Sequence, residues 1–99
     1  MQKDPDQMLV EFNDSAGRLL AFLFSRFRQN VQSLNRKKDD NVFQQLQAKY
    51  LFSFKNELGN MAKAYIEKCG AANMHELSNR LNSSVNIFTN EFIQQMRSL

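Results

Sequence analysis

The residue types that most often carry out catalysis are scarce in this 99-residue sequence, which contains one cysteine and one histidine. Cys69 and His75 lie six residues apart across a predicted turn, so a thiol and a general base form the one nucleophilic pair that the chain offers. Such a pair also needs a group that orients the histidine and a pocket for a substrate, and the sequence indicates neither. We therefore expect Cys69 to be a small buried apolar residue.

Acidic pairs occur at Asp4 and Asp6 and again at Asp39 and Asp40. Both pairs lie where helices are predicted to begin, and the positive end of a helix dipole explains carboxylates there without a catalytic role. A zinc site needs about four ligands, which one His and one Cys in unlike settings do not supply. Glycine-rich phosphate-binding motifs are absent from the sequence. We expect no enzymatic activity, no metal ion and no cofactor.

Positive charge is concentrated early in the chain. Residues 15–40 contain six Lys and Arg and two Asp, whereas residues 1–14 contain one Lys and four acidic residues. The basic residues in and after the first apolar segment are Arg18, Arg26, Arg28, Arg36, Lys37 and Lys38. If they converged, they would neutralise several phosphates. On a helical wheel the first three form no single stripe, and a helix-turn-helix would need a shorter second helix, so nucleic-acid binding remains an alternative function.

Apolar residues recur at steps of three and four along three segments, which is typical of helices with one buried side. The three stripes are Met8, Phe12, Ala16, Leu19, Leu23, Phe27, Val31 and Leu34; Phe43, Leu46, Tyr50, Phe54, Leu58, Met61, Tyr65 and Cys69; and Met74, Leu77, Leu81, Val85, Phe88, Phe92, Met96 and Leu99. The sequence therefore predicts an all-α fold with helices at about 5–36, 40–69 and 74–98. Short connections make it an elongated antiparallel three-helix bundle, a single domain over residues 1–99.

Capping residues support the two breaks between these segments. Asp4 is a candidate N-cap before Pro5, Gly70 can adopt a left-handed C-terminal cap, and Asn73 is a candidate N-cap answered by Glu76. An alternative architecture is one continuous coiled-coil rod of about 140 Å, because the apolar phase can be carried across both breaks. The caps, and the absence of regular Glu and Lys pairing beside the stripe, favour the bundle.

Two glycines interrupt the predicted helices. Gly17 and Gly59 each cost a helix about 1 kcal/mol relative to alanine. We expect close packing of a neighbouring helix to compensate for both.

Several apolar residues miss the stripe of their own helix: Val10, Phe22, Phe52, Ile66, Ile87 and Ile93. In an antiparallel hairpin that turns near residue 37, Phe22 and Phe52 lie at the same height, and a second turn near residue 71 brings Ile93 to nearly that height. We interpret these three residues as an apolar belt for self-association or for a partner helix. The simpler alternative is that a Phe-rich bundle has wide stripes and a few exposed apolar residues.

The sequence thus favours a non-enzymatic protein-binding module, an adaptor, chaperone-like or regulatory subunit, that also associates with itself. Its expected contact residues are Phe22, Phe52 and Ile93, flanked by the basic residues Arg26, Arg28, Arg36, Lys37 and Lys38, which would steer an acidic partner. A coiled-coil scaffold segment is a further alternative. The longest apolar run has six residues where a membrane span needs about 20, so we expect no membrane span. The single cysteine suits a reducing compartment, and we expect an intracellular location, cytoplasmic or nuclear.

Overall fold

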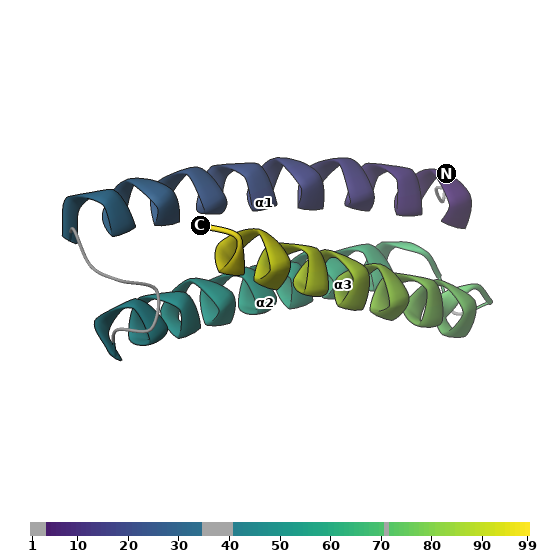
Figure 1. Cartoon of the computed structure of the whole chain (residues 1–99). Helices are drawn as coiled ribbons and strands as arrows, with labels where there is room; N and C mark the ends of the chain where they lie inside the picture. The colour runs from purple at the N-terminus through teal and green to yellow at the C-terminus, as the bar shows by residue number, and fades with distance from the viewer. Residues whose placement is uncertain (1–3, 35–40, 71) are drawn as a thin grey trace.

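The computed structural model describes residues 4–34, 41–70 and 72–99 of the chain. They form three α-helices, which are α1 (Pro5–Leu34), α2 (Asn41–Lys68) and α3 (Met74–Arg97). The helices pack pairwise, and α2 runs antiparallel to both α1 and α3 (Figure 1). The fold is therefore the predicted elongated three-helix bundle, with Cα extents of 51 × 17 × 17 Å. A continuous rod does not form.

The start of α1 follows the predicted capping chemistry. The Asp4 carboxylate accepts a hydrogen bond of 3.0 Å from the backbone N–H of Asp6, which satisfies one of the amides that a helix leaves unpaired at its first turn. Pro5 is the first helical residue, where its missing N–H costs nothing. The predicted continuation of this helix to residue 36 lies outside the described residues.

The connection between α2 and α3 confirms one predicted cap and corrects the other. Gly70 has a φ of 82°, a left-handed conformation that glycine adopts without steric cost, and α2 ends at Lys68. Asn73 occupies the N-cap position of α3, but its side chain makes no capping hydrogen bond. The expected reciprocal hydrogen bond of Glu76 with Asn73 is also not made. The Glu76 carboxylate instead lies 3.9 Å from the guanidinium of Arg80.

The core consists mainly of the predicted stripes. The largest fully buried side chains are Phe12, Phe27, Phe54, Phe92, Met8, Leu58, Leu77, Leu81 and Met96. Their rings pack edge to face between helices, as in Phe27 of α1 against Phe43 and Tyr50 of α2, with centroids 5.6 Å apart in both pairs. The prediction for Met74 was wrong, because this first residue of α3 is 45% exposed at the end of the bundle.

The two helical glycines lack the close packing that we expected of them. A methyl group built on Gly59 would meet nothing within 4 Å, and one built on Gly17 would meet only the Phe88 ring, at 4.0 Å. Neither helix approaches its neighbour more closely because of its glycine. Gly59 is exposed, so its cost to α2 is not offset by packing against the residues that the structure describes.

Candidate functional site

Four of the six apolar residues that miss their stripes are exposed in the bundle. The exposed fractions are 67% for Val10, 57% for Phe22, 72% for Phe52 and 64% for Ile87. Ile66 is half-buried and packs against the core. Wide apolar stripes therefore do not account for Phe22 and Phe52, since the core contains four other fully buried phenylalanines.

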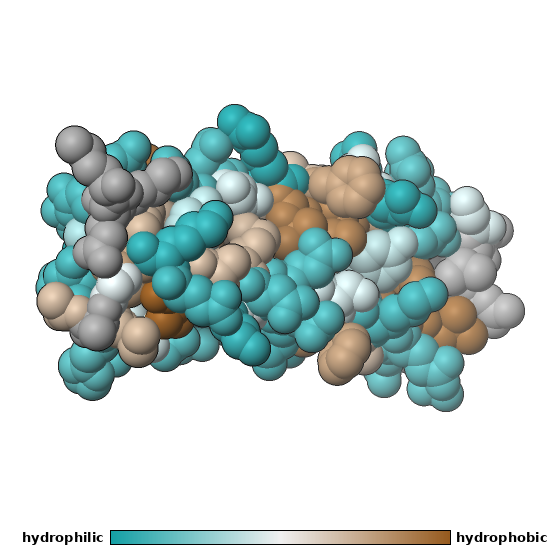
Figure 2. All heavy atoms as spheres, turned by 180° about the vertical axis from the view of Figure 1, so that it is seen from behind, coloured by the Kyte–Doolittle hydropathy of each residue, from teal (hydrophilic) through white to brown (hydrophobic). Residues whose placement is uncertain are grey.

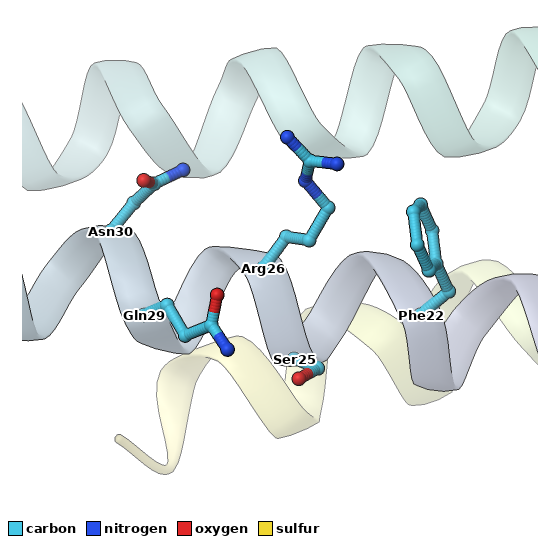
Figure 3. A pocket seen from close by; sticks show the side chains of 5 residues that line it. All are labelled: Phe22, Ser25, Arg26, Gln29 and Asn30. Carbon is cyan, nitrogen blue, oxygen red and sulfur yellow. The ribbon is translucent and has the colours of Figure 1, made fainter.

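Phe22 lies on the side of α1 that is next to α2. Figure 3 shows Phe22, Arg26 and Asn30 in a row one turn apart, with their side chains directed toward α2. The Arg26 guanidinium lies over the Phe22 ring, 5.5 Å from its centroid, in a cation–π contact. Together with Ser25 and Gln29, these three residues line an open hollow of about 460 Å³.

The neighbouring part of α2 continues this face. The Asn30 amide donates a hydrogen bond to the hydroxyl of Tyr50, which joins the two helices beside the hollow. A second hollow, of about 220 Å³, is lined by Val42, Gln45, Leu46 and Lys49 of α2. Figure 2 looks onto the side where α1 and α2 lie together and shows apolar surface near its middle, surrounded by hydrophilic side chains. We call this surface the α1–α2 face.

Ile93 lies on a different side of the molecule. It is half-buried and lines a third hollow, of about 200 Å³, together with Ala48 and Leu51 of α2. The rim of this hollow is formed by Gln44, Gln47 and Arg97. Phe52 stands one turn after both Ala48, which lines this hollow, and Lys49, which lines the hollow of the α1–α2 face, so it projects from the outer side of α2 at the border of the third hollow. We call the hollow and its border the α2–α3 groove.

The three predicted belt residues thus share a height but not a direction. Their common height along the bundle axis follows from two ring contacts nearby. Phe27 of α1 packs against Tyr50 of α2, and Phe54 of α2 packs against Phe92 of α3, with centroids 5.6 and 4.8 Å apart. Ile93 lies in the α2–α3 groove, Phe52 projects at the outer border of that groove, and Phe22 lies on the α1–α2 face. There are accordingly two candidate surfaces, and no continuous belt.

The predicted basic flank is divided in a similar way. Arg26 is exposed and covers Phe22, while Arg28 is exposed two residues further on, about 200° around the helix. Arg18 forms an ion pair of 2.9 Å with Asp14 on its own helix. Arg36, Lys37 and Lys38 lie outside the described residues. In the described part of α1, the arginines therefore point in different directions.

Cys69 and His75, the candidate nucleophilic pair that the sequence offers, lie in different environments. Cys69 is fully buried, as expected, and its Sγ lies 3.1 Å and 3.3 Å from the carbonyl oxygens of Ile66 and Gly70. His75 is exposed, and its Nε2 lies 3.4 Å from the side-chain nitrogen of Asn79. Across residues 4–34, 41–70 and 72–99, no three His, Cys, Asp or Glu side chains are grouped as a metal site requires.

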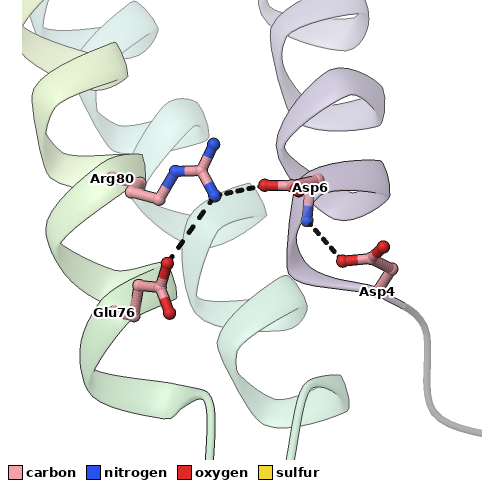
Figure 4. Close-up of polar contacts among 4 residues, drawn as sticks. All are labelled: Asp4, Asp6, Glu76 and Arg80. Carbon is pink, nitrogen blue, oxygen red and sulfur yellow. Dashed lines mark hydrogen bonds and ion pairs between the residues drawn. The ribbon is translucent and has the colours of Figure 1, made fainter.

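One polar cluster joins α1 to α3 near the N-terminus. Figure 4 shows the Arg80 guanidinium between the carboxylates of Asp6 and Glu76, with Asp4 capping the helix beside them. The hydrogen bond from Arg80 to Asp6 is the main reason that the pKa of Arg80 is raised above its ordinary value. All of these side chains reach solvent, so the cluster is a surface contact that orients α1 against α3.

Sequence reasoning missed most of the α2–α3 groove. Ala48, Leu51 and Arg97 were not among the predicted contact residues, although they line the hollow with Ile93. The spacing of Ala48 and Phe52, one turn apart on α2, could have indicated that they lie along the same side of the helix. What the sequence could not supply was the direction in which α3 lies from that turn.

No protein-family model, curated protein or solved structure matches this chain. Among the described residues, no helix is both long enough and apolar enough to span a membrane.

Proposed function

We propose that this chain is a non-enzymatic, intracellular protein-binding module that acts through its helix faces and associates with itself. The observation that carries the proposal is the exposure of Phe22 and Phe52, 57% and 72%, on a bundle whose core is already filled by other phenylalanines. Burial of one such side chain is worth about 1.5–3 kcal/mol. Large aromatic residues near the middle of a surface are typical energetic centres of protein interfaces.

The surroundings of Phe22 support a protein partner. Arg26 covers part of the ring and leaves a charged edge beside an apolar centre, with Asn30 and Gln29 able to form hydrogen bonds around it. An apolar centre with a polar rim is the usual arrangement of a protein interface. The lone thiol of Cys69 suits a reducing compartment, and we therefore place the protein in the cytoplasm.

Light scattering on a sizing column tests self-association. We expect the wild-type chain to run above its protomer mass of 11.6 kDa and the Phe22→Ser, Phe52→Ser double variant to run closer to it. The matched control replaces Val10 and Ile87, which are just as exposed, with serine. This control lowers surface hydrophobicity equally and should leave the mass unchanged.

Three results would contradict the proposal. A wild-type mass of one protomer at all concentrations would show that the chain does not self-associate. An equal loss of mass in the Val10 and Ile87 control would show that association is nonspecific and does not depend on Phe22 and Phe52. If the protein instead carries 260 nm absorbance that high salt removes, the basic residues bind nucleic acid and the alternative function replaces the one proposed.

A further inference from the structure

The α2–α3 groove continues along one side of α2 beyond its hollow. Ala48, Phe52, Lys55 and Gly59 follow one another at steps of four, three and four residues, so they form one row along the helix. All four are exposed, and Ala48 places the row next to α3 because it shares the hollow with Ile93 and Arg97. Together with Gln44, which lines the hollow one turn before Ala48, the groove extends along α2 to Gly59 for about 22 Å, at 1.5 Å per residue. This is the length of about four turns of a helix.

The row offers a shape that a second helix can fill. Phe52 projects from it, whereas Gly59, two turns later, leaves open space where a side chain would stand. No residue in the described part of the chain fills that space, although the glycine costs α2 about 1 kcal/mol. Apolar residues are also distributed more evenly around α2 than around α1 or α3. A helix with a second apolar side usually buries it against a partner.

The groove is basic. Lys55, within the row, and Arg97, on α3 beside it, are both exposed, and neither side chain forms an ion pair within the described ranges. Lys63, one turn after Gly59, is likewise exposed and unpaired with any described carboxylate.

The acidic residues of α2 and α3 lie elsewhere. Glu57 follows Tyr50 by seven residues and therefore lies on the side of α2 that faces α1. Glu76 contacts Arg80, and Glu91 follows Arg80 by three turns, so both lie on the side of α3 that faces α1. Glu67 lies two turns beyond Gly59, near the end of α2. The groove from Gln44 to Gly59 thus has positive charges and no described carboxylate on it.

From this geometry we infer that the α2–α3 groove binds one amphipathic helix of a partner protein, with an apolar stripe over Phe52 and Gly59 and with acidic residues that face Lys55 and Arg97. This inference rests on the proposed function, because it names the partner of the Phe52 surface. The bound helix completes a four-helix arrangement, in which its apolar stripe covers Ala48, Leu51 and Ile93.

A second copy of this chain fits the groove less well, which leaves self-association to the α1–α2 face around Phe22. An α2 helix placed against another α2 would bring Lys55 and Lys63 toward the same residues of the other copy. The carboxylates at the start of α1 are already engaged, Asp6 by Arg80 and Asp14 by Arg18. Glu11 is also engaged within the chain. An acidic helix from another protein is therefore the occupant that the charges favour.

Amide chemical shifts of the ¹⁵N-labelled full chain, titrated with a synthetic helical peptide, test the inference. The peptide has 15 residues, leucine at heptad a and d positions and glutamate beside them, and a second peptide has lysine in place of glutamate. We expect saturable shifts at Ala48, Leu51, Phe52 and Ile93 with the glutamate peptide, and binding that is at least about tenfold weaker with the lysine peptide.

Two substitutions separate binding from folding. Lys55→Glu should weaken binding of the glutamate peptide about tenfold and strengthen binding of the lysine peptide, whereas Lys49→Glu, on the other side of α2, should do neither. Gly59→Gln should fill the open space and weaken binding about tenfold, yet leave the chain folded, because helix propensity rises with this change.

Several outcomes would overturn the inference. These are shifts centred on Phe22 and Arg26, equal binding of the two peptides, equal effects of Lys55→Glu and Lys49→Glu, or no saturable binding. Shifts at the α1–α2 face would refute the groove but keep a protein-binding function. If the Phe22 and Phe52 double variant has a lower mass but the wild type binds no peptide, only the inference about the groove is refuted. If the wild type is monomeric but binds the peptide, only self-association is refuted.

Discussion

The rings of Phe54 on α2 and Phe92 on α3 meet edge to face with centroids 4.8 Å apart, and both side chains are fully buried. Phe52, two residues before Phe54, points the opposite way and is 72% exposed. Two phenylalanines within one turn of the same helix therefore have different roles. One holds the bundle together, and the other is available to a partner.

Replacing these two residues with alanine should separate the roles. Phe54→Ala removes a ring from the packed centre and should lower the free energy of unfolding by about 3–5 kcal/mol. Phe52→Ala removes a ring that mostly contacts water and should change it by less than about 1 kcal/mol. Urea denaturation followed by circular dichroism measures both. A loss of stability in Phe52→Ala as large as in Phe54→Ala would show that Phe52 belongs to the core.

Gly59→Ala should stabilise the protein, because an added methyl group meets open space and the substitution improves helix propensity by about 1 kcal/mol. For a domain of this size that gain raises Tm by about 4–8 °C. Gly17→Ala is the matched comparison, since its methyl group would touch the Phe88 ring at 4.0 Å, an ordinary contact, and a similar gain is expected. Thermal denaturation checks both. A decrease in Tm for Gly59→Ala would reveal a packing constraint that the bundle does not show.

The fold could be predicted from the sequence because the positions of the helices depend on the spacing of residues that are near one another in the chain. Steps of three and four residues identified Phe12, Phe27, Phe54 and Phe92 as core, and all four are fully buried. The positive φ of Gly70 follows from the same local chemistry. Errors arose at helix ends, where the Asn73 side chain makes no capping bond and Met74 is exposed at the first position of α3.

The candidate surfaces were less predictable because they depend on how the helices are turned about their axes. Periodicity shows that Phe22 and Phe52 lie outside the core stripes, and the length of the hairpin predicts that they lie at the same height along the bundle. It does not show that Phe22 faces the α1–α2 side while Phe52 borders the groove with Ile93. The same limit applies to Gly59, since only the placement of α3 shows that no helix packs against it.

The Arg80 contact with Asp6 should stabilise the bundle equally at all ordinary pH values. The pKa of Arg80 is raised by its hydrogen bond to Asp6, so the stabilisation is fully present below the pKa of the unfolded chain. As the pH rises, it is lost through the still higher pKa of the folded state, beyond the physiological range. Arg80→Gln should therefore lower Tm by the same small amount at pH 6 and pH 9.

Salt provides the control for this contact. Because the side chains of Arg80 and Asp6 are solvent-accessible, the difference in Tm between wild type and Arg80→Gln should shrink in 1 M salt. Arg18→Gln removes a comparable pair within α1 alone, with Asp14, and should have a smaller effect, since it joins no second helix. A difference in Tm that changes between pH 6 and pH 9 would indicate that another titrating group controls the cluster.

The thiol of Cys69 should react only when the C-terminal end of α2 opens. Its Sγ is buried beneath the turn at Gly70 and lies within hydrogen-bond distance of the Ile66 carbonyl oxygen, so a labelling reagent cannot reach it in the closed bundle. Labelling with a chromogenic disulfide should be slow in buffer and fast in urea. Gly70→Ala strains the left-handed turn and should speed labelling in buffer, because it favours local opening. Rapid labelling of the folded wild type would instead mean an accessible, activated thiol and would reopen the question of chemistry at Cys69.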